Sequence, residues 1–182
     1  MLTIVVLFFL QFSYADVNSC SGGKSFEIKS DKHGSGFHFA FVSGKSFKFS
    51  ACFDQSAKYD LGNINQLDAN KLLGHSDCTS FHHKNSARFG WRWNEKTNKI
   101  EILAYSYADK VRSIEFMGEM NLFEKANFEI LTRENDYLFK FKNQVVVMNR
   151  GCEQKNPIRY KLYPYFGGDE VAPHNINVFI WQ

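Results

Sequence analysis

Apolar and polar residues alternate along most of the chain, and this period of two is typical of strands that bury one face. Phe26 and Ile28 alternate with charged neighbours, and Phe47 and Phe49 alternate with serine and lysine. The number and short spacing of such segments predict an all-β antiparallel β-sandwich of roughly eleven strands. The segments span residues 26–28, 37–41, 47–49, 87–93, 99–107, 111–119, 127–131, 137–142, 144–148, 159–166 and 175–181.

Residues 63–74 differ from the rest because their apolar positions follow a helical spacing. Asn65 suits the start of a helix and Gly74 suits its end, so we expect one short helix here. No linker, composition shift or internal repeat divides the chain. Residues 16–182 are therefore expected to form a single β-sandwich domain.

The segment 87–105 predicts a hairpin whose register can be counted. A four-residue turn at positions 95–98 pairs Asn94 with Lys99. A slip by one residue would place two arginines on the apolar face and bury their charge, so the register is well specified. The predicted pairs are Trp93 with Ile100, Arg92 with Glu101, Trp91 with Ile102, Gly90 with Leu103, Phe89 with Ala104, and Arg88 with Tyr105.

This register separates the core from a candidate binding face. Trp91 and Trp93 fall on the apolar face, so we predict that they fill the core rather than stack on sugars. The other face surrounds Gly90, which permits close approach of a ligand. Arginine forms paired hydrogen bonds to hydroxyl or carboxylate groups, and tyrosine adds a stacking surface with a polar tip. A solvated face with an Arg92–Glu101 pair is the open alternative. The predicted binding residues are Arg88, Arg92, Glu101, Tyr105 and Tyr107, with Arg159 and Tyr163 from a later strand.

The first residues resemble an export signal. An apolar run from Leu2 to Phe12 is followed by Ser13 and Ala15, which suit a signal-peptidase site. We expect residues 1–15 to be a signal peptide, with a buried N-terminal strand as the alternative. The run is too short for a permanent transmembrane segment, so we expect a secreted or periplasmic protein without one.

Four cysteines in an exported chain indicate two disulfide bonds. Three pairings are open. We prefer Cys52 with Cys78, which would close the predicted helical excursion, and Cys20 with Cys152, which would hold the mature N-terminus. Four free buried thiols are the alternative.

Composition narrows the class of partner. Aromatic residues make up 16% of the chain and 19 of them are phenylalanine, which argues against disorder and coiled coil. The net charge of +3 is too small to indicate nucleic acid, but it suits an acidic polysaccharide.

The C-terminal segment 163–181 predicts a strand, a tight loop at Gly167-Gly168 and a closing strand. Asp169 and Glu170 lie in this loop, and two adjacent carboxylates without further oxygen ligands favour a solvated turn, so we expect no cofactor; a calcium site at these two residues is the alternative. The segment resembles the last strands of secreted concanavalin-like jelly-roll sandwiches, which implies glycan binding or polysaccharide cleavage. Alginate-lyase-like members use arginine, a Gln-x-His strand and a tyrosine. This chain has Arg88, Arg92 and Tyr165, but it lacks the Gln-x-His strand.

No hydrolase, zinc-protease or phosphate-binding motif occurs. We therefore predict a lectin-like protein that binds an extracellular glycan or acidic polysaccharide. One alternative is a polysaccharide lyase or glycoside hydrolase on the same scaffold, with Tyr165 or His174 transferring the proton. The other is a structural or adhesive envelope or matrix protein that has no small ligand and forms oligomers through its exposed aromatics.

Overall fold

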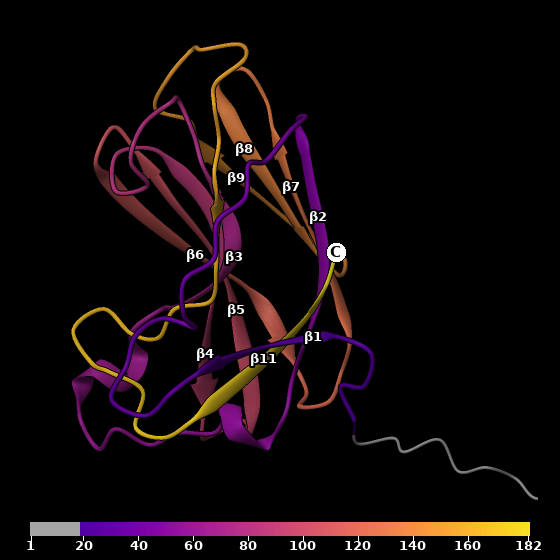
Figure 1. The fold of residues 1–182 in the computed structure, drawn as a ribbon, viewed down its shortest axis with the longest axis vertical. Helices are drawn as coiled ribbons and strands as arrows, with labels where there is room; N and C mark the ends of the chain where they lie inside the picture. The colour runs from indigo at the N-terminus through magenta and orange to yellow at the C-terminus, as the bar shows by residue number, and fades with distance from the viewer. Residues whose placement is uncertain (1–18) are drawn as a thin grey trace, which may run out of the picture.

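The computed structural model describes residues 19–182, so the predicted signal peptide at residues 1–15 lies outside the described residues. The described chain forms two antiparallel sheets packed face to face (Figure 1). The six-stranded sheet has the order β1-β11-β2-β7-β8-β9, and the five-stranded sheet has the order β10-β3-β4-β5-β6. The predicted all-β sandwich is confirmed. Across the described residues, no helix is long and apolar enough to span a membrane.

Ten of the eleven strands in the described chain overlap strands that the alternation predicted. They are β1 (Lys24–Ile28), β2 (Ser46–Phe53), β3 (Asn70–Ser76), β4 (Ser86–Asn94), β5 (Lys99–Ala108), β6 (Val111–Met120), β7 (Ala126–Thr132), β8 (Asp136–Phe141), β9 (Gln144–Asn149), β10 (Lys161–Leu162) and β11 (Ile176–Trp181). Two short 3₁₀ helices, η1 (Gln55–Ala57) and η2 (Ile64–Leu67), precede β3.

Aromatic side chains from the two sheets meet in the core. Phe89 and Trp91 on β4 project from the five-stranded sheet toward phenylalanines of the six-stranded sheet. The ring centroids of Phe89 and Phe128 are 4.9 Å apart, and those of Trp91 and Phe53 are also 4.9 Å apart. Each such contact adds about 0.5–1.5 kcal/mol to the burial of the rings. The phenylalanine excess therefore fills the interior between the sheets.

The predicted hairpin register is confirmed at every pair. Asn94 lies opposite Lys99, Trp91 opposite Ile102, and Arg88 opposite Tyr105. Trp91 is fully buried and Trp93 is 5% exposed, as predicted for core residues. The arginines lie on the outer face of the five-stranded sheet.

The predicted helix at residues 63–74 is wrong. Only η2 is helical, and the chain then enters strand β3. Leu72 and Leu73 are both fully buried because a β-bulge between Lys71 and Gly74 shifts the register. Gly74 does not end a helix; a Cβ there would lie 2.2 Å from the Ala87 carbonyl oxygen. The adjacent leucines resembled a helical pattern because a bulge also places neighbouring residues on one side.

The predicted strand at residues 37–41 does not form as a regular strand. Its phenylalanines point into solvent, and only an isolated bridge joins Phe41 to Tyr160. The predicted strand at residues 159–166 is reduced to β10 and isolated bridges. These segments run side by side through the middle of Figure 1 as an irregular edge of the five-stranded sheet.

The preferred disulfide pairing is also wrong. Cys20 bonds Cys52, and Cys78 bonds Cys152, with Cα–Cα distances of 5.7 and 6.1 Å. The first pair forms because β1 and β2 both flank β11, which brings the residues before β1 next to β2. Two disulfides are the cysteine usage typical of extracellular proteins.

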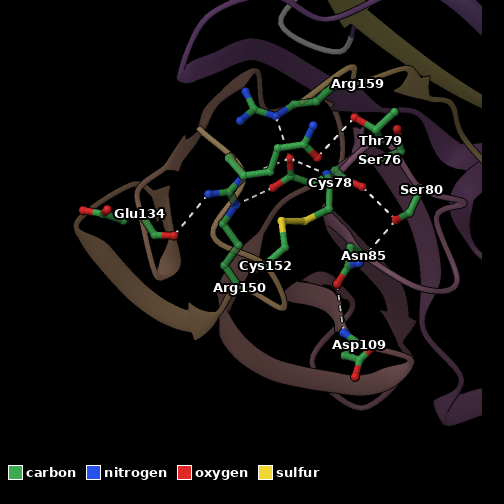
Figure 2. Close-up of a disulfide and its surroundings, with 12 residues drawn as sticks. Ser76, Cys78, Thr79, Ser80, Asn85, Asp109, Glu134, Arg150, Cys152 and Arg159 are labelled. Atoms are coloured by element: carbon green, nitrogen blue, oxygen red, sulfur yellow. Dashed lines mark hydrogen bonds and ion pairs between the residues drawn. A yellow bond between two sulfur atoms is a disulfide. The ribbon is translucent and has the colours of Figure 1, made fainter. Parts of the chain in front are cut away.

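The second disulfide lies beside a buried ion-pair network (Figure 2). Asp77 is fully buried, and its carboxylate accepts from Arg150 Nε at 2.7 Å and from Arg159 Nε at 2.9 Å. Tyr137 donates its hydroxyl proton to the same carboxylate at 2.8 Å. These donors hold the pKa of Asp77 at about 2 against the opposing effect of burial. The network joins the residue that follows β3 to β8 and to the segment 150–159.

Candidate functional site

The candidate site lies on the outer face of the five-stranded sheet, where β3, β4 and β5 are neighbours. Arg88 on β4 lies directly opposite Tyr105 on β5, so their side chains share this face. The Arg88 guanidinium is 5.7 Å from the centroid of the Tyr105 ring. Lys71 on β3 lies opposite Gly90, the next outward-facing position of β4. Strand pairing thus brings two cations and a tyrosine together.

Arg88 is a buried cation without a carboxylate partner. Arg88 is only 7% exposed, and its Nε has no hydrogen-bond partner. Within residues 19–182, none of the ion pairs includes Arg88. Burial lowers the pKa of Arg88 to about 10. Because a buried charge is costly when it is unpaired, this position favours an anionic ligand.

Lys71 adds a second cation to the site, an amine whose pKa is lowered. Its Nζ donates to the Gly167 carbonyl oxygen and lies 5.7 Å from the ring centroid of Tyr105 and 5.6 Å from that of Tyr165. Burial and then the Arg88 charge lower the pKa of Lys71 to about 8. Asp68 raises it, but less strongly. The pKa of this amine therefore lies well below the usual range of a lysine.

Tyrosines surround the two cations. Tyr105 is 3% exposed, and burial raises its pKa to about 12. The Tyr107 ring lies 5.8 Å from it, opposite Arg112 on β6. Tyr165 exchanges backbone hydrogen bonds with Lys71, and its ring stacks on His33 with centroids 5.0 Å apart. Tyr165 is 37% exposed, so it borders the site on the solvent side.

Lys71 and Arg112 were missed by the sequence analysis. Lys71 fell inside the predicted helix, so its position beside Gly90 depended on an unrecognised strand. Arg112 could have been found by extending the register from β5 to β6, which pairs it with Tyr107. Tyr165 was considered only as a proton donor or acceptor, and the structure places it against Lys71.

Arg92 and Glu101 form the cross-strand pair that the register allowed. Arg92 Nε lies 2.5 Å from Glu101 Oε2, and Arg92 Nη1 donates to the Leu67 carbonyl at 2.8 Å. Glu101 also accepts from Asn94 at 2.6 Å. These groups already have partners, so they are less available to a ligand than Arg88. The space beside Gly90 is taken by the Asn70 carbonyl and the buried Leu103 side chain.

Two other predicted residues lie outside the cluster. Arg159 is 6% exposed and is held by Asp77 and by the Gly44 carbonyl. Tyr163 packs against Phe26 and His38, with ring centroids 5.8 and 4.9 Å away. Neither is brought next to Arg88 by these contacts.

The C-terminal loop residues have separate contacts. Glu170 accepts from the Asn65 amide at 2.8 Å, and His174 Nε2 lies 2.9 Å from the Ser56 carbonyl oxygen. In the described part of the chain, the one grouping of three potential metal ligands is Asp77 with Cys78 and Cys152. The two cysteines form a disulfide there, so this grouping is not a metal site. The structure adds no third ligand of this kind to Asp169 and Glu170.

A groove of about 900 Å³ lies on the outer face of the other sheet, and three of its four lysines are in ion pairs. The fourth, Lys125, lies at the exposed edge of the groove with its Nζ 4.2 Å from the Trp181 ring centroid. Lys48 and Lys140 both pair with Glu129, and Lys142 pairs with Glu124. We therefore place the candidate site at Arg88, a buried cation that has no acidic partner within residues 19–182.

Comparisons with known proteins establish the fold. No protein-family model and no curated protein matches the sequence. The alginate lyase AlyC3 is similar in structure, with a TM-score of 0.57, 11% identity, and coverage of 86% of this chain and 71% of that chain. Carbohydrate binding module CBM66 from Bacillus subtilis gives a TM-score of 0.40 at 10% identity, covering 85% and 81%. Chicken galectin 2 gives 0.41 at 11%, covering 86% and 98%. The similarity to AlyC3 confirms the predicted resemblance to concanavalin-like jelly-roll sandwiches at the level of the fold.

Proposed function

We propose that this protein is an extracellular glycan-binding protein that recognises an acidic sugar through Arg88 and Lys71. The observation that carries the proposal is the buried Arg88 guanidinium, which has a free Nε and no ion pair among the described residues. A guanidinium binds a carboxylate through two parallel hydrogen bonds.

The surrounding tyrosines support a sugar rather than a free inorganic anion. Tyr107 and Tyr165, which are partly exposed, offer ring faces for the apolar side of a pyranose and hydroxyl groups for its polar edge, while the buried Tyr105 packs against Tyr107. The fold similarity to an alginate lyase is consistent with a carbohydrate ligand. The function therefore depends on both the cations and the rings around them.

The proposal is tested by titrating the mature protein with alginate, pectate, chondroitin sulfate and heparin, with neutral glucans as references. We expect binding to at least one acidic polysaccharide, weakened about tenfold in Lys71→Met because a charged hydrogen bond contributes about 1.5–3 kcal/mol. Lys140→Met is the matched control, since Lys140 lies on the other sheet. Absence of binding to every acidic polysaccharide, or equal losses in both variants, would reject the proposal.

Binding should weaken between pH 7 and pH 9.5. Lys71 has a pKa of about 8, so it loses its positive charge in this window. His82 and Tyr105 face the same region but titrate at about 4 and about 12, outside it. Arg88, with a pKa of about 10, keeps most of its charge up to pH 9.5. We expect affinity to fall about five- to tenfold by calorimetry. The fall should be absent in Lys71→Met; a fall of the same size in that variant would assign it to another group.

A second candidate function is β-elimination of an acidic polysaccharide at the same face. It is favoured by the contact of Tyr165 with Lys71, whose lowered pKa suits a general base. In such a step Arg88 would neutralise the sugar carboxylate, and the Lys71 amine would take the adjacent ring proton. The C–O bond to the leaving sugar would then break as a C=C bond forms, with Tyr165 protonating the leaving oxygen. Unsaturated product absorbs in the ultraviolet, so alginate, pectate or chondroitin sulfate that stays without such absorbance argues against this activity.

A further inference from the structure

A row of phenylalanines is exposed along the irregular edge of the five-stranded sheet. Residues 34–42 run antiparallel to residues 159–165, joined by hydrogen bonds from Lys161 N to the Ala40 oxygen and from Val42 N to the Arg159 oxygen. His38 and Val42 turn inward, His38 against Phe26 and Val42 against the core. Because side chains alternate along an extended chain, Phe37, Phe39 and Phe41 turn the other way, into solvent.

Neighbouring segments extend this surface. Phe41 lies directly opposite Tyr160, so the two side chains share a face. Tyr160 contacts His82, whose backbone N–H donates to the Tyr160 hydroxyl at 2.9 Å. Phe81 precedes His82, and Ile158 lies two residues before Tyr160. We call the exposed members of this surface the aromatic edge, and they are Phe37, Phe39, Phe41, Phe81 and Ile158.

The side chains of the aromatic edge are unusually exposed for large apolar residues at a protein surface. Phe37 is 94% exposed and Phe81 is 82% exposed, while the remaining three members are 60–68% exposed. Phe39 and Phe41 also contact each other, with ring centroids 5.0 Å apart. Adjacent large apolar side chains that are exposed to water mark a surface that binds a protein, a ligand or a membrane.

The charges of the same segments distinguish between these kinds of partner. Residues 32–53, 78–94 and 154–168 contain three lysines or arginines each and no aspartate or glutamate. The three arginines among them are buried or paired with Glu101 and Asp77, so the surface charge comes from the six lysines. Five of these cations are lysines near the aromatic edge in sequence: Lys32, Lys45, Lys84, Lys155 and Lys161. In contrast, the outer face of the six-stranded sheet pairs its lysines with glutamates. The aromatic edge is therefore apolar in its exposed side chains and positive around them.

We propose that the aromatic edge docks the protein on an anionic lipid bilayer. Phenylalanines would insert at the boundary between headgroups and acyl chains, and the lysines would contact the negatively charged headgroups. Phenylalanine offers a sugar no hydrogen bond, which makes a glycan the weaker occupant. This binding surface lies beside the Arg88 site but does not depend on the glycan function.

Vesicle co-flotation tests the docking with the full mature protein. We expect binding to phosphatidylcholine vesicles that contain about 30% phosphatidylserine, and little binding to pure phosphatidylcholine. The pair Phe39→Ser and Phe41→Ser should lower the partition coefficient at least about tenfold. The matched control is the pair Val145→Ser and Val147→Ser on β9, whose side chains are 56% and 53% exposed. Raising the salt from about 0.1 to 0.5 M should also weaken binding.

Three results would overturn the proposal. The first is no binding to anionic vesicles by the wild-type protein. The second is an equal loss in the phenylalanine and valine variants, which would indicate a general effect of surface apolarity. The third is a dimer in light scattering that the phenylalanine variant abolishes, which would make the aromatic edge a contact between copies of this chain. Lys71→Met should retain vesicle binding, so failure of glycan binding would leave this test unaffected.

Discussion

Replacing Arg88 by leucine is expected to abolish binding of acidic glycan while leaving the fold equally stable or more stable. The guanidinium is buried without a carboxylate partner, and burial moves its pKa from 12.5 to about 10. A folded pKa below the unfolded value means that the charged form is disfavoured by folding at neutral pH. This change in pKa corresponds to at most about 3 kcal/mol of the free energy of unfolding. We therefore expect Arg88→Leu to gain about 1–2 kcal/mol in the free energy of unfolding.

The two effects have opposite signs, and this makes the measurement informative. We expect glycan affinity to fall at least about 100-fold, since a charge-assisted pair in a desolvated site is lost. Urea denaturation would report the free energy of unfolding, and calorimetry the affinity. Arg92→Leu is the control, because Arg92 is paired with Glu101 and should lose stability on replacement. A strongly destabilised Arg88→Leu, or one that still binds glycan, would contradict the assignment.

Asp77→Asn should have the largest effect on stability. The carboxylate is fully buried and joins Arg150, Arg159 and Tyr137, so its neutralisation leaves two largely buried guanidinium groups without a counter-charge. Breaking such a buried pair costs about 3–5 kcal/mol. Asp136→Asn removes a partly exposed pair with Arg133 and should cost about 1 kcal/mol or less. Comparable losses in the two variants in urea would show that the Asp77 network contributes little.

The same network should shape the acid stability of the fold. Asp77 has a folded pKa of about 2 against an ordinary value of 3.8. A depressed carboxyl pKa contributes stability above the unfolded value, and that contribution is lost as the pH falls through about 2. The difference corresponds to about 2 kcal/mol. Unfolding curves between pH 5 and pH 1.5 should therefore show a drop of about this size that is missing in Asp77→Asn.

The hairpin shows how much local pattern can specify. Period-two alternation and a four-residue turn predicted every pair from Asn94–Lys99 to Arg88–Tyr105, because any slip would have buried arginine. The same reasoning assigned Trp91 and Trp93 to the core and Arg88 and Tyr105 to the outer face. Half of the candidate site could thus be predicted from the sequence alone.

The other half depended on contacts between distant segments. Lys71 reaches the site only because residues 70–76 form a strand with a bulge, and the sequence pattern there favoured a helix. Tyr165 reaches Lys71 through an isolated bridge that no periodicity predicts. Arg159 looked like a binding residue on its strand, and the structure pairs it with Asp77. The partner of a charged side chain is a tertiary property, so its availability could not be judged from spacing.

The sequence by itself determined the sandwich class, most strand positions and the face of each residue in the central hairpin. These follow from local terms, since burial of one strand face and turn chemistry act within a few residues. Only the tertiary structure decided the disulfide pairs, the β-bulge in β3, the exposure of residues 37–41 and the absence of a carboxylate beside Arg88 within residues 19–182. Those features depend on which strands become neighbours across the sheets, and long-range pairing leaves no periodic trace along the chain.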